Sequence, residues 1–174
     1  NQVMVNISDA QGTFTNNTIV AGAGIGVQIS QPIVSLGVNS GNTVHSCVTG
    51  GFRVLNVIGG TISNLTSWRN LGYGINLNTV NSVTVDSFVG FGNNGLNILL
   101  QAVLNVLFLS PTSNGDTTFA TITGIMTTGV LGTIIIEGGD FGTVGGIKTA
   151  HGSADIYFNV ASFGQLILRN VQLA

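Results

Sequence analysis

The sequence predicts an all-β fold, a right-handed parallel β-helix (solenoid) of about seven coils, and three observations lead to it. The composition is that of strands and turns, because charged residues make up 6% of the 174 residues and glycine occupies 26 positions. A glycine followed by alternating apolar residues recurs along the chain. A second series of short strands recurs out of phase with the first.

The first series is a glycine followed by apolar residues at every second position. Subtracting the numbers of the leading glycines gives spacings of 27, 23, 21 and 51 residues, and the last fits two turns. Such a period is typical of a repeat architecture, in which each coil buries its apolar side chains against the next coil, about 4.8 Å along the axis. Its members are Gly24–Ile29, Gly51–Leu55, Gly74–Leu77, Gly95–Ile98 and Gly146–Thr149.

The second series consists of short apolar strands, most of them followed by a glycine-containing turn. Two strand series per period require a coil with at least two faces, and three faces is the usual number. The members of this series are Val83–Val85, Val106–Phe108, Ile134–Ile136, Ile156–Phe158 and Leu166–Leu168.

Two other fold classes fit the sequence less well. No long window holds the apolar spacing of an amphipathic helix, because glycine or asparagine interrupts nearly every candidate. An antiparallel sandwich or barrel is the stronger rival, and it predicts Asn-Gly or Asp-Gly hairpin turns. Asn94-Gly95 is a turn of this kind, but the period exceeds that of a simple hairpin, which favours the solenoid.

Corners between strands need residues that tolerate a left-handed backbone, and asparagine and glycine do so most readily. The stretch from Ser110 to Thr118 combines proline and glycine in a polar setting, so we expect it to leave the coil as a loop. The asparagines that we expect at corners are Asn39, Asn42, Asn70, Asn93 and Asn94.

Length and composition predict one β-helix domain over residues 1–174. Because the chain begins at Asn1 without a methionine, we expect this domain to be a fragment or processed product of a larger protein. Cys47 is the single cysteine, so we expect no internal disulfide and no cofactor or metal site built on thiols. Basic residues are too few to dock on phosphates, and the apolar stretch Leu96–Leu109 is shorter than the ~20 residues of a spanning helix. We therefore expect neither nucleic-acid binding nor membrane insertion.

Three carboxylates are the candidate catalytic residues. Asp86 and Glu137 end matching strands of the second series, so we expect them two rungs apart, about 9.6 Å, with Leu109 between them. This separation is near the upper end of that between the acid and base of an inverting glycosidase. Asp140 follows Glu137 across two glycines and adds a third carboxylate at a bend. A purely structural role on solvent-facing strand ends is the competing interpretation.

The candidate ligand-binding residues are Trp68, Arg69 and Tyr73, because exposed rings and a neighbouring cation are typical of sugar contacts. His45 and His151 lack neighbours in metal-ligand spacing, so no metal site is predicted. Three asparagines match the acceptor pattern for N-glycosylation, which matters only in a secreted protein of a glycosylating cell. They are Asn6, Asn16 and Asn64.

Four segments together resemble the pectate-lyase-like β-helix superfamily, and within it most closely bacteriophage tailspikes and tail-fibre proteins. They are Gly74–Leu77, Val83–Asp86, Gly92–Ile98 and Ile134–Gly139. The resemblance implies a homotrimer at the virion surface, or otherwise an extracellular protein, that binds host surface polysaccharide. The small number of charged side chains agrees with assembly, because an outer face of the solenoid would need cover from other chains.

Three functions remain open, and the third does not depend on this resemblance. The first is a structural and glycan-binding module of the virion surface. The second is a fragment of a polysaccharide depolymerase, a glycosidase or lyase, although the scarcity of basic residues speaks against a lyase. The third is a non-viral extracellular adhesin, or an ice-binding solenoid that uses Thr121–Thr123 and Thr127–Thr128.

Overall fold

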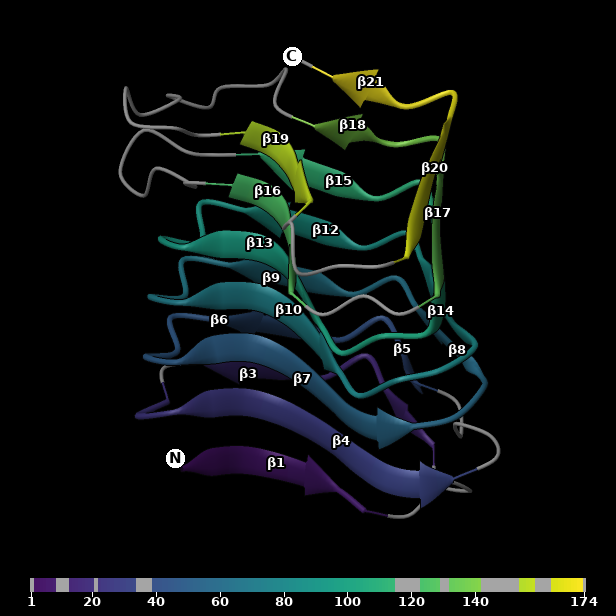
Figure 1. Cartoon of the computed structure of the whole chain (residues 1–174). Helices are drawn as coiled ribbons and strands as arrows, with labels where there is room; N and C mark the ends of the chain where they lie inside the picture. The colour runs from purple at the N-terminus through teal and green to yellow at the C-terminus, as the bar shows by residue number, and fades with distance from the viewer. Residues whose placement is uncertain are drawn as a thin grey trace.

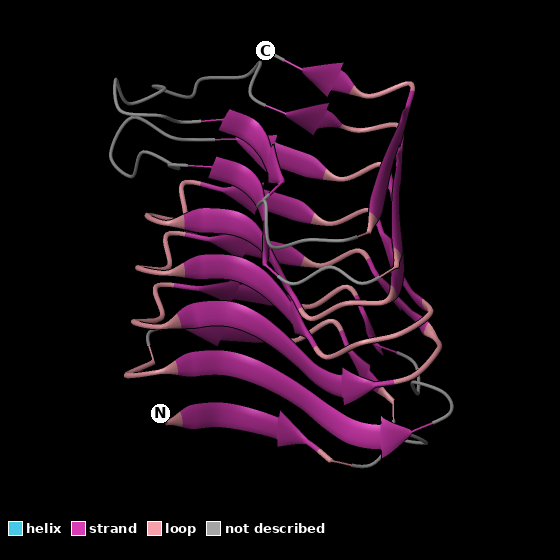
Figure 2. Cartoon of the chain, viewed as in Figure 1, coloured by secondary structure: helices cyan, strands magenta, loops and turns pink. Residues whose placement is uncertain are grey.

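The computed structural model describes residues 2–8, 13–20, 22–33, 39–114, 123–128, 132–141, 154–158 and 164–173. Within these ranges every regular element is a β-strand, and no helix occurs (Figure 2). The strands stack along one axis, with the described N-terminal strand at one end and the C-terminal strand at the other (Figure 1).

The strands form three parallel sheets, here called A, B and C, and the chain visits them in that order in every coil. Sheet A contains β1 (Val3–Ile7), β4 (Ile25–Ile33), β7 (Gly50–Val57), β10 (Tyr73–Asn78), β13 (Leu96–Gln101), β16 (Thr123–Thr128) and β19 (Ala154–Phe158). Sheet B contains β2 (Phe14–Thr15), β5 (Asn39–Ser40), β8 (Thr61–Ser63), β11 (Val83–Asp86), β14 (Asn105–Leu109), β17 (Thr133–Glu137) and β20 (Gln165–Arg169). Sheet C contains β3 (Thr18–Val20), β6 (Thr43–His45), β9 (Thr66–Trp68), β12 (Val89–Phe91), β15 (Thr112–Asn114), β18 (Asp140–Phe141) and β21 (Gln172–Leu173).

All pairs between the described strands are parallel, for example β7 with β10 and β11 with β14. This confirms the all-β parallel solenoid and excludes the antiparallel sandwich for this part of the chain. Each sheet holds seven strands, but the segment described without a gap, from β5 to β15, makes about four turns. About four turns, and not the expected seven coils, are therefore described in full.

The interior is filled by apolar side chains that stack on their register partners one coil away. Phe52, Ile75 and Ile98 form one such column on sheet A, and all three are fully buried. Val85 and Phe108 continue the same principle on sheet B. Because each coil alone leaves its inner side chains half uncovered, this stacking across rungs is what stabilises the fold.

A residue with a left-handed backbone begins each described corner between sheets B and C, and at Gly138 the next residue, Gly139, is left-handed as well. The φ values of the residues that begin these corners lie between 45° at Ser110 and 69° at Gly41, and six of their N–H groups donate to a carbonyl one coil further on, at 2.8–3.1 Å. One left-handed residue turns the chain sharply, and asparagine and glycine adopt this conformation at the lowest cost. The seven corner residues are Asn16, Gly41, Asn64, Ser87, Ser110, Gly138 and Asn170.

Buried asparagines hold the corner between sheets C and A. The side-chain amide of Asn70 donates to Oδ1 of Asn93, 23 residues later, at 2.8 Å, and Oδ1 of Asn70 accepts the N–H of Cys47 at 2.9 Å. Both asparagines are fully buried. The expectation of corner asparagines is thus confirmed for these two and for Asn42, which follows Gly41 and is also fully buried.

Three sequence-based expectations about local structure are wrong. Ile156–Phe158 belongs to β19 of sheet A and not to the second strand series, which lies in sheet B. Thr112–Asn114 is strand β15, so the predicted loop from Ser110 begins with a two-residue corner and a strand, while residues 115–118 lie outside the described part. Asn39 lies in β5 and not at a corner.

Candidate functional site

The outer face of sheet A carries a column of polar side chains. Gln28 on β4, Arg53 on β7 and Asn76 on β10 are register partners in three successive coils. Their chain neighbours on either side point into the core, so by strand alternation these three side chains point outward. We call Gln28, Arg53 and Asn76 the sheet A polar column.

A hydrogen-bonded cluster of amides fixes the upper part of this column. Oε1 of Gln101 on β13 accepts hydrogen bonds from Nδ2 of Asn76 at 3.0 Å and from Nδ2 of Asn78 at 3.1 Å. Asn76 is only 4% exposed, although it lies on an outer face. The amide of Asn76 is therefore held in one orientation, with Nδ2 used by Gln101 and Oδ1 directed elsewhere.

Two polar atoms of the column are shielded from solvent without a partner. Among the described residues, neither Nε of Arg53 nor Oδ1 of Asn76 has a hydrogen-bond partner. A buried polar atom that lacks a partner costs roughly 1–3 kcal/mol. One atom is a donor and the other an acceptor, and they belong to register partners on adjacent strands. A ligand with a neighbouring acceptor and donor would satisfy both.

Tyr73 borders the column at the start of β10. Its ring covers Gly50, where any added Cβ would collide with the ring carbons. Burial raises the pKa of Tyr73, while the positive charge of Arg53 and a side-chain hydrogen bond with Asn76 partly oppose this rise. The phenol is therefore protonated at neutral pH and lies within electrostatic reach of Arg53.

Arg53 is the charged residue on four neighbouring strands of sheet A. The four strands β4, β7, β10 and β13 contain Arg53 and no acidic residue. On the described coils this part of sheet A therefore presents a positive centre among amides, and the neighbouring side chains do not neutralise it.

Sheet C carries a column of rings on its outer face. His45, Trp68 and Phe91 are partly exposed, and they stack with centroids 4.1 Å apart for the first pair and 5.8 Å for the second. Interplanar angles of 18° and 4° show that the rings are close to parallel. Burial, and then the charge of Arg69, lower the pKa of His45, so its ring is neutral at pH 7.

This stacking changes the interpretation of Trp68. Both of its ring faces are covered by neighbouring rings, and the guanidinium carbon of Arg69 lies 5.3 Å from the ring centroid. Sugar contacts typically use a free ring face, so the geometry favours a stabilising role for Trp68. Of the predicted ligand residues, the structure brings Trp68 and Arg69 together and places Tyr73 on another sheet.

The predicted relation between Asp86 and Glu137 is confirmed at the level of register. Asp86 pairs with Leu109, and Leu109 pairs with Glu137, so the two acids share one row of sheet B with one rung between them. Oδ1 of Asp86 accepts the hydroxyl of Ser87 at 2.8 Å. Glu137 pairs with Arg169 one coil on, at 3.8 Å, with the two side chains 48% and 55% exposed. The side chain of Leu109 separates the acids.

Asp140 lies on a different sheet from the other two acids. It begins β18 of sheet C, directly after the left-handed residues Gly138 and Gly139, and pairs with Thr112 and Gln172. The three predicted catalytic carboxylates are therefore spread over two faces of the solenoid.

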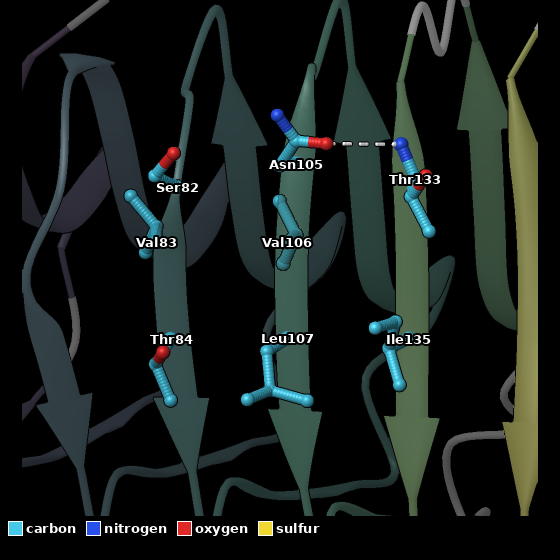
Figure 3. Close-up of a pocket in the computed structure, with 8 residues that line it drawn as sticks. All are labelled: Ser82, Val83, Thr84, Asn105, Val106, Leu107, Thr133 and Ile135. Carbon is cyan, nitrogen blue, oxygen red and sulfur yellow. Dashed lines mark hydrogen bonds between the residues drawn. The ribbon is translucent and has the colours of Figure 1, made fainter.

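A shallow hollow of about 200 Å³ lies on the outer face of sheet B (Figure 3). The partly buried side chains of Leu107 and Ile135 stand beside each other on adjacent strands, and Oδ1 of Asn105 accepts the backbone N–H of Thr133 at 3.3 Å (Figure 3). Ile167 continues the apolar row on β20. We call Leu107, Ile135 and Ile167 the sheet B apolar row.

Sequence reasoning missed Arg53 and Asn76 as site residues. Their spacing of 23 residues matches the coil length of this region, so a register assigned from sequence would have aligned them. Among the described residues, no group of three or more His, Cys, Asp or Glu side chains is placed to hold a metal ion. His151 and the threonines of the ice-binding alternative fall on residues whose placement or side chains are outside the described part.

The part of the chain that the structure describes contains no helix of sufficient length and apolarity to cross a membrane. The chain matches no protein-family model, no curated protein and no solved structure.

Proposed function

We propose that this chain is a structural module of a virion surface protein that binds host polysaccharide without cleaving it. The binding residues are those of the sheet A polar column together with Tyr73. The observation that carries this proposal is the pair of sheltered polar atoms, Nε of Arg53 and Oδ1 of Asn76, which lack partners among the described residues.

Several features of sheet A support a carbohydrate ligand. Carbohydrate hydroxyls both donate and accept hydrogen bonds, as this site requires. The amide of Asn76 is held by Gln101, so the site loses little side-chain entropy on binding. Successive coils repeat about every 4.8 Å, a spacing that lets an extended polymer run along the axis and meet one polar residue per rung.

The proposal is tested by retention on a panel of immobilised polysaccharides, neutral and acidic. We expect the wild-type chain to be retained by at least one of them and the Asn76→Ala variant to lose this retention. Thr84→Ala, on the outer face of sheet B, is the matched control and should bind like the wild type. A wild-type chain that no polysaccharide retains would show that the proposal is wrong.

We further propose that the solenoid is right-handed and assembles as a homotrimer. The strands of sheet A run left to right in front while the strands of sheet C run right to left behind and the chain climbs, which supports the right-handed sense (Figure 1). The sheet B apolar row supports assembly about an axis parallel to the solenoid, because each rung then meets the same rung of the next chain. Mass photometry tests the stoichiometry, and a stable monomer would refute the trimer.

The depolymerase alternative receives less support from the geometry. Glu137 is bound to Arg169, Leu109 stands between Glu137 and Asp86, and Asp140 lies on sheet C. The test is release of reducing sugar by the wild type and by single Asp86→Ala, Glu137→Ala and Asp140→Ala variants. Sugar release by the wild type that any of these substitutions abolishes would favour the enzyme over the binding module.

A further inference from the structure

We infer that the sheet A polar column recognises the carboxylate of an acidic sugar, and that Arg53 is the residue that selects it. This inference rests on the proposed glycan-binding function and deepens it by naming the class of ligand. The juxtaposition that carries it is a guanidinium donor beside an amide acceptor, both sheltered and both without partners among the described residues.

The donor side of the site fits an anion. Arg53 lies on β7, and neither β7 nor its neighbours β4 and β10 contain an acidic residue. Its register partners, Gln28 and Asn76, are uncharged and do not neutralise its charge. A guanidinium is a planar fork that matches a planar carboxylate with two parallel hydrogen bonds. A partly shielded guanidinium also binds an anion more strongly than a fully hydrated one does.

The acceptor side requires a second group on the same ligand. Oδ1 of Asn76 accepts hydrogen bonds and repels anions, so the group that meets it must be a donor such as a hydroxyl. Acidic sugars carry a carboxylate and ring hydroxyls within a few ångströms of each other. Simple anions such as phosphate or sulfate supply acceptors without a fixed neighbouring donor, and would satisfy Arg53 alone.

Tyr73 adds selectivity at the edge of the site. Its hydroxyl is protonated at neutral pH because burial raises its pKa, so it serves as a neutral donor beside the cation. Its ring lies over Gly50 on sheet A. The acidic sugar is therefore met by one charged donor, one neutral donor and one fixed acceptor.

A competing interpretation is that the two sheltered atoms bond to each other in solution and bind nothing. Asn76→Asp separates the two ideas. If Arg53 and residue 76 only pair internally, the new carboxylate strengthens that pair and leaves glycan retention as in the wild type. If the site binds a carboxylate, the new negative charge repels the ligand and retention is lost while the fold is kept.

The experiment measures binding of immobilised hyaluronan, polygalacturonate and polysialic acid as carboxylate probes, dextran sulfate as a sulfate probe, and dextran and galactan as neutral probes. We expect the wild type to bind at least one carboxylate probe, and Arg53→Met and Asn76→Asp to weaken this binding by about tenfold to a hundredfold. Arg169→Gln, which removes an exposed cation from sheet B, is the matched control and should bind as the wild type does. Circular dichroism confirms that each variant keeps its β-structure, and only folded variants are compared.

Four results would overturn the inference. Binding to neutral probes alone leaves glycan binding intact but removes the selection of an acid, and so does binding to dextran sulfate alone. Carboxylate binding that survives both Arg53→Met and Asn76→Asp removes these residues as the site. A wild-type chain that binds none of the probes refutes the inference together with the proposed function.

Discussion

Replacing Asn70 by alanine should destabilise the solenoid more than any surface substitution of similar size. Asn70 is fully buried at the corner between sheets C and A, where it links three successive coils. Its side chain makes three hydrogen bonds: Oδ1 accepts Cys47 N–H at 2.9 Å, and Nδ2 donates to Asn93 Oδ1 at 2.8 Å and Ser67 Oγ at 2.9 Å. The alanine variant loses all three.

The magnitude follows from which groups are left without a partner. Asn93 Oδ1 still accepts the backbone N–H of Asn70 at 3.2 Å, and Ser67 Oγ still donates to the carbonyl of Gly74 at 3.0 Å. The N–H of Cys47 loses its acceptor in a buried position. The two bonds to Asn93 and Ser67 at about 1 kcal/mol each, plus about 1–3 kcal/mol for the buried N–H of Cys47 that is left without an acceptor, give a loss of about 3–5 kcal/mol.

The assay is urea unfolding followed by circular dichroism, with the free energy of unfolding compared between variants. Asn94→Ala is the control, because Asn94 is exposed at the same corner and should change the free energy by less than about 0.5 kcal/mol. The double variant Asn70→Ala/Asn93→Ala should lose less than the sum of the single variants, since they share a bond. A loss below about 1 kcal/mol for Asn70→Ala would refute the reasoning that this column holds the coils together.

Three further predictions concern other parts of the solenoid. Phe108→Ala should lower the free energy of unfolding by about 3–5 kcal/mol, because Phe108 is fully buried between Val85 and Ile136; urea unfolding measures this, and a loss below about 1 kcal/mol would contradict it. Ala102 has a left-handed backbone with φ 50°, so Ala102→Gly should stabilise the fold by about 0.5–1 kcal/mol, while Ala102→Ser should give no such gain. A lower melting temperature for the glycine variant would contradict this prediction. The raised pKa of Tyr73 adds stability that is present below the pKa of unfolded tyrosine and is lost as pH rises through the higher folded pKa. Because the charge of Arg53 lowers this pKa, Arg53→Met should move the ultraviolet titration of Tyr73 to still higher pH. A move to lower pH would show that Arg53 does not act on the phenol.

The longer strands were predictable from sequence because their signals are local. Gly74–Leu77 and Val83–Val85 alternate inward apolar and outward residues, and both lie within strands, β10 and β11. The strands of sheet C were not identified, because they are two or three residues long and β9 turns only Ser67 inward. So short a segment has no period to detect.

Residues that depend on register escaped prediction. Arg53 looked like a scattered charge until the pairing of β7 with β10 placed it beside Asn76. Trp68 looked like a sugar platform until the register of sheet C placed rings on both sides of it. Asn39 and Asn42 have similar polar neighbours, and what separates them is the left-handed backbone of Gly41 between them. In each case a contact between coils decides the role, and local sequence does not encode it.

The proposed binding and the proposed assembly use different outer faces of the solenoid, so the two could occur together. Rings on sheet C cover one another, so that face needs no partner for its aromatic surface. The sheet B apolar row is partly exposed beside the hollow, and contact with another chain would bury it. A trimer axis beside sheet B would leave sheet A facing outward in all three chains, so three polar columns would run in parallel along one rod. A polysaccharide repeat that meets several columns would then bind with avidity even if each Arg53 site is weak.

Leu107→Asp should therefore abolish assembly and lower the apparent affinity for a polymer. The affinity of a single chain for a short oligosaccharide should stay unchanged. An equal loss of affinity for polymer and oligosaccharide would show that the two faces do not act separately.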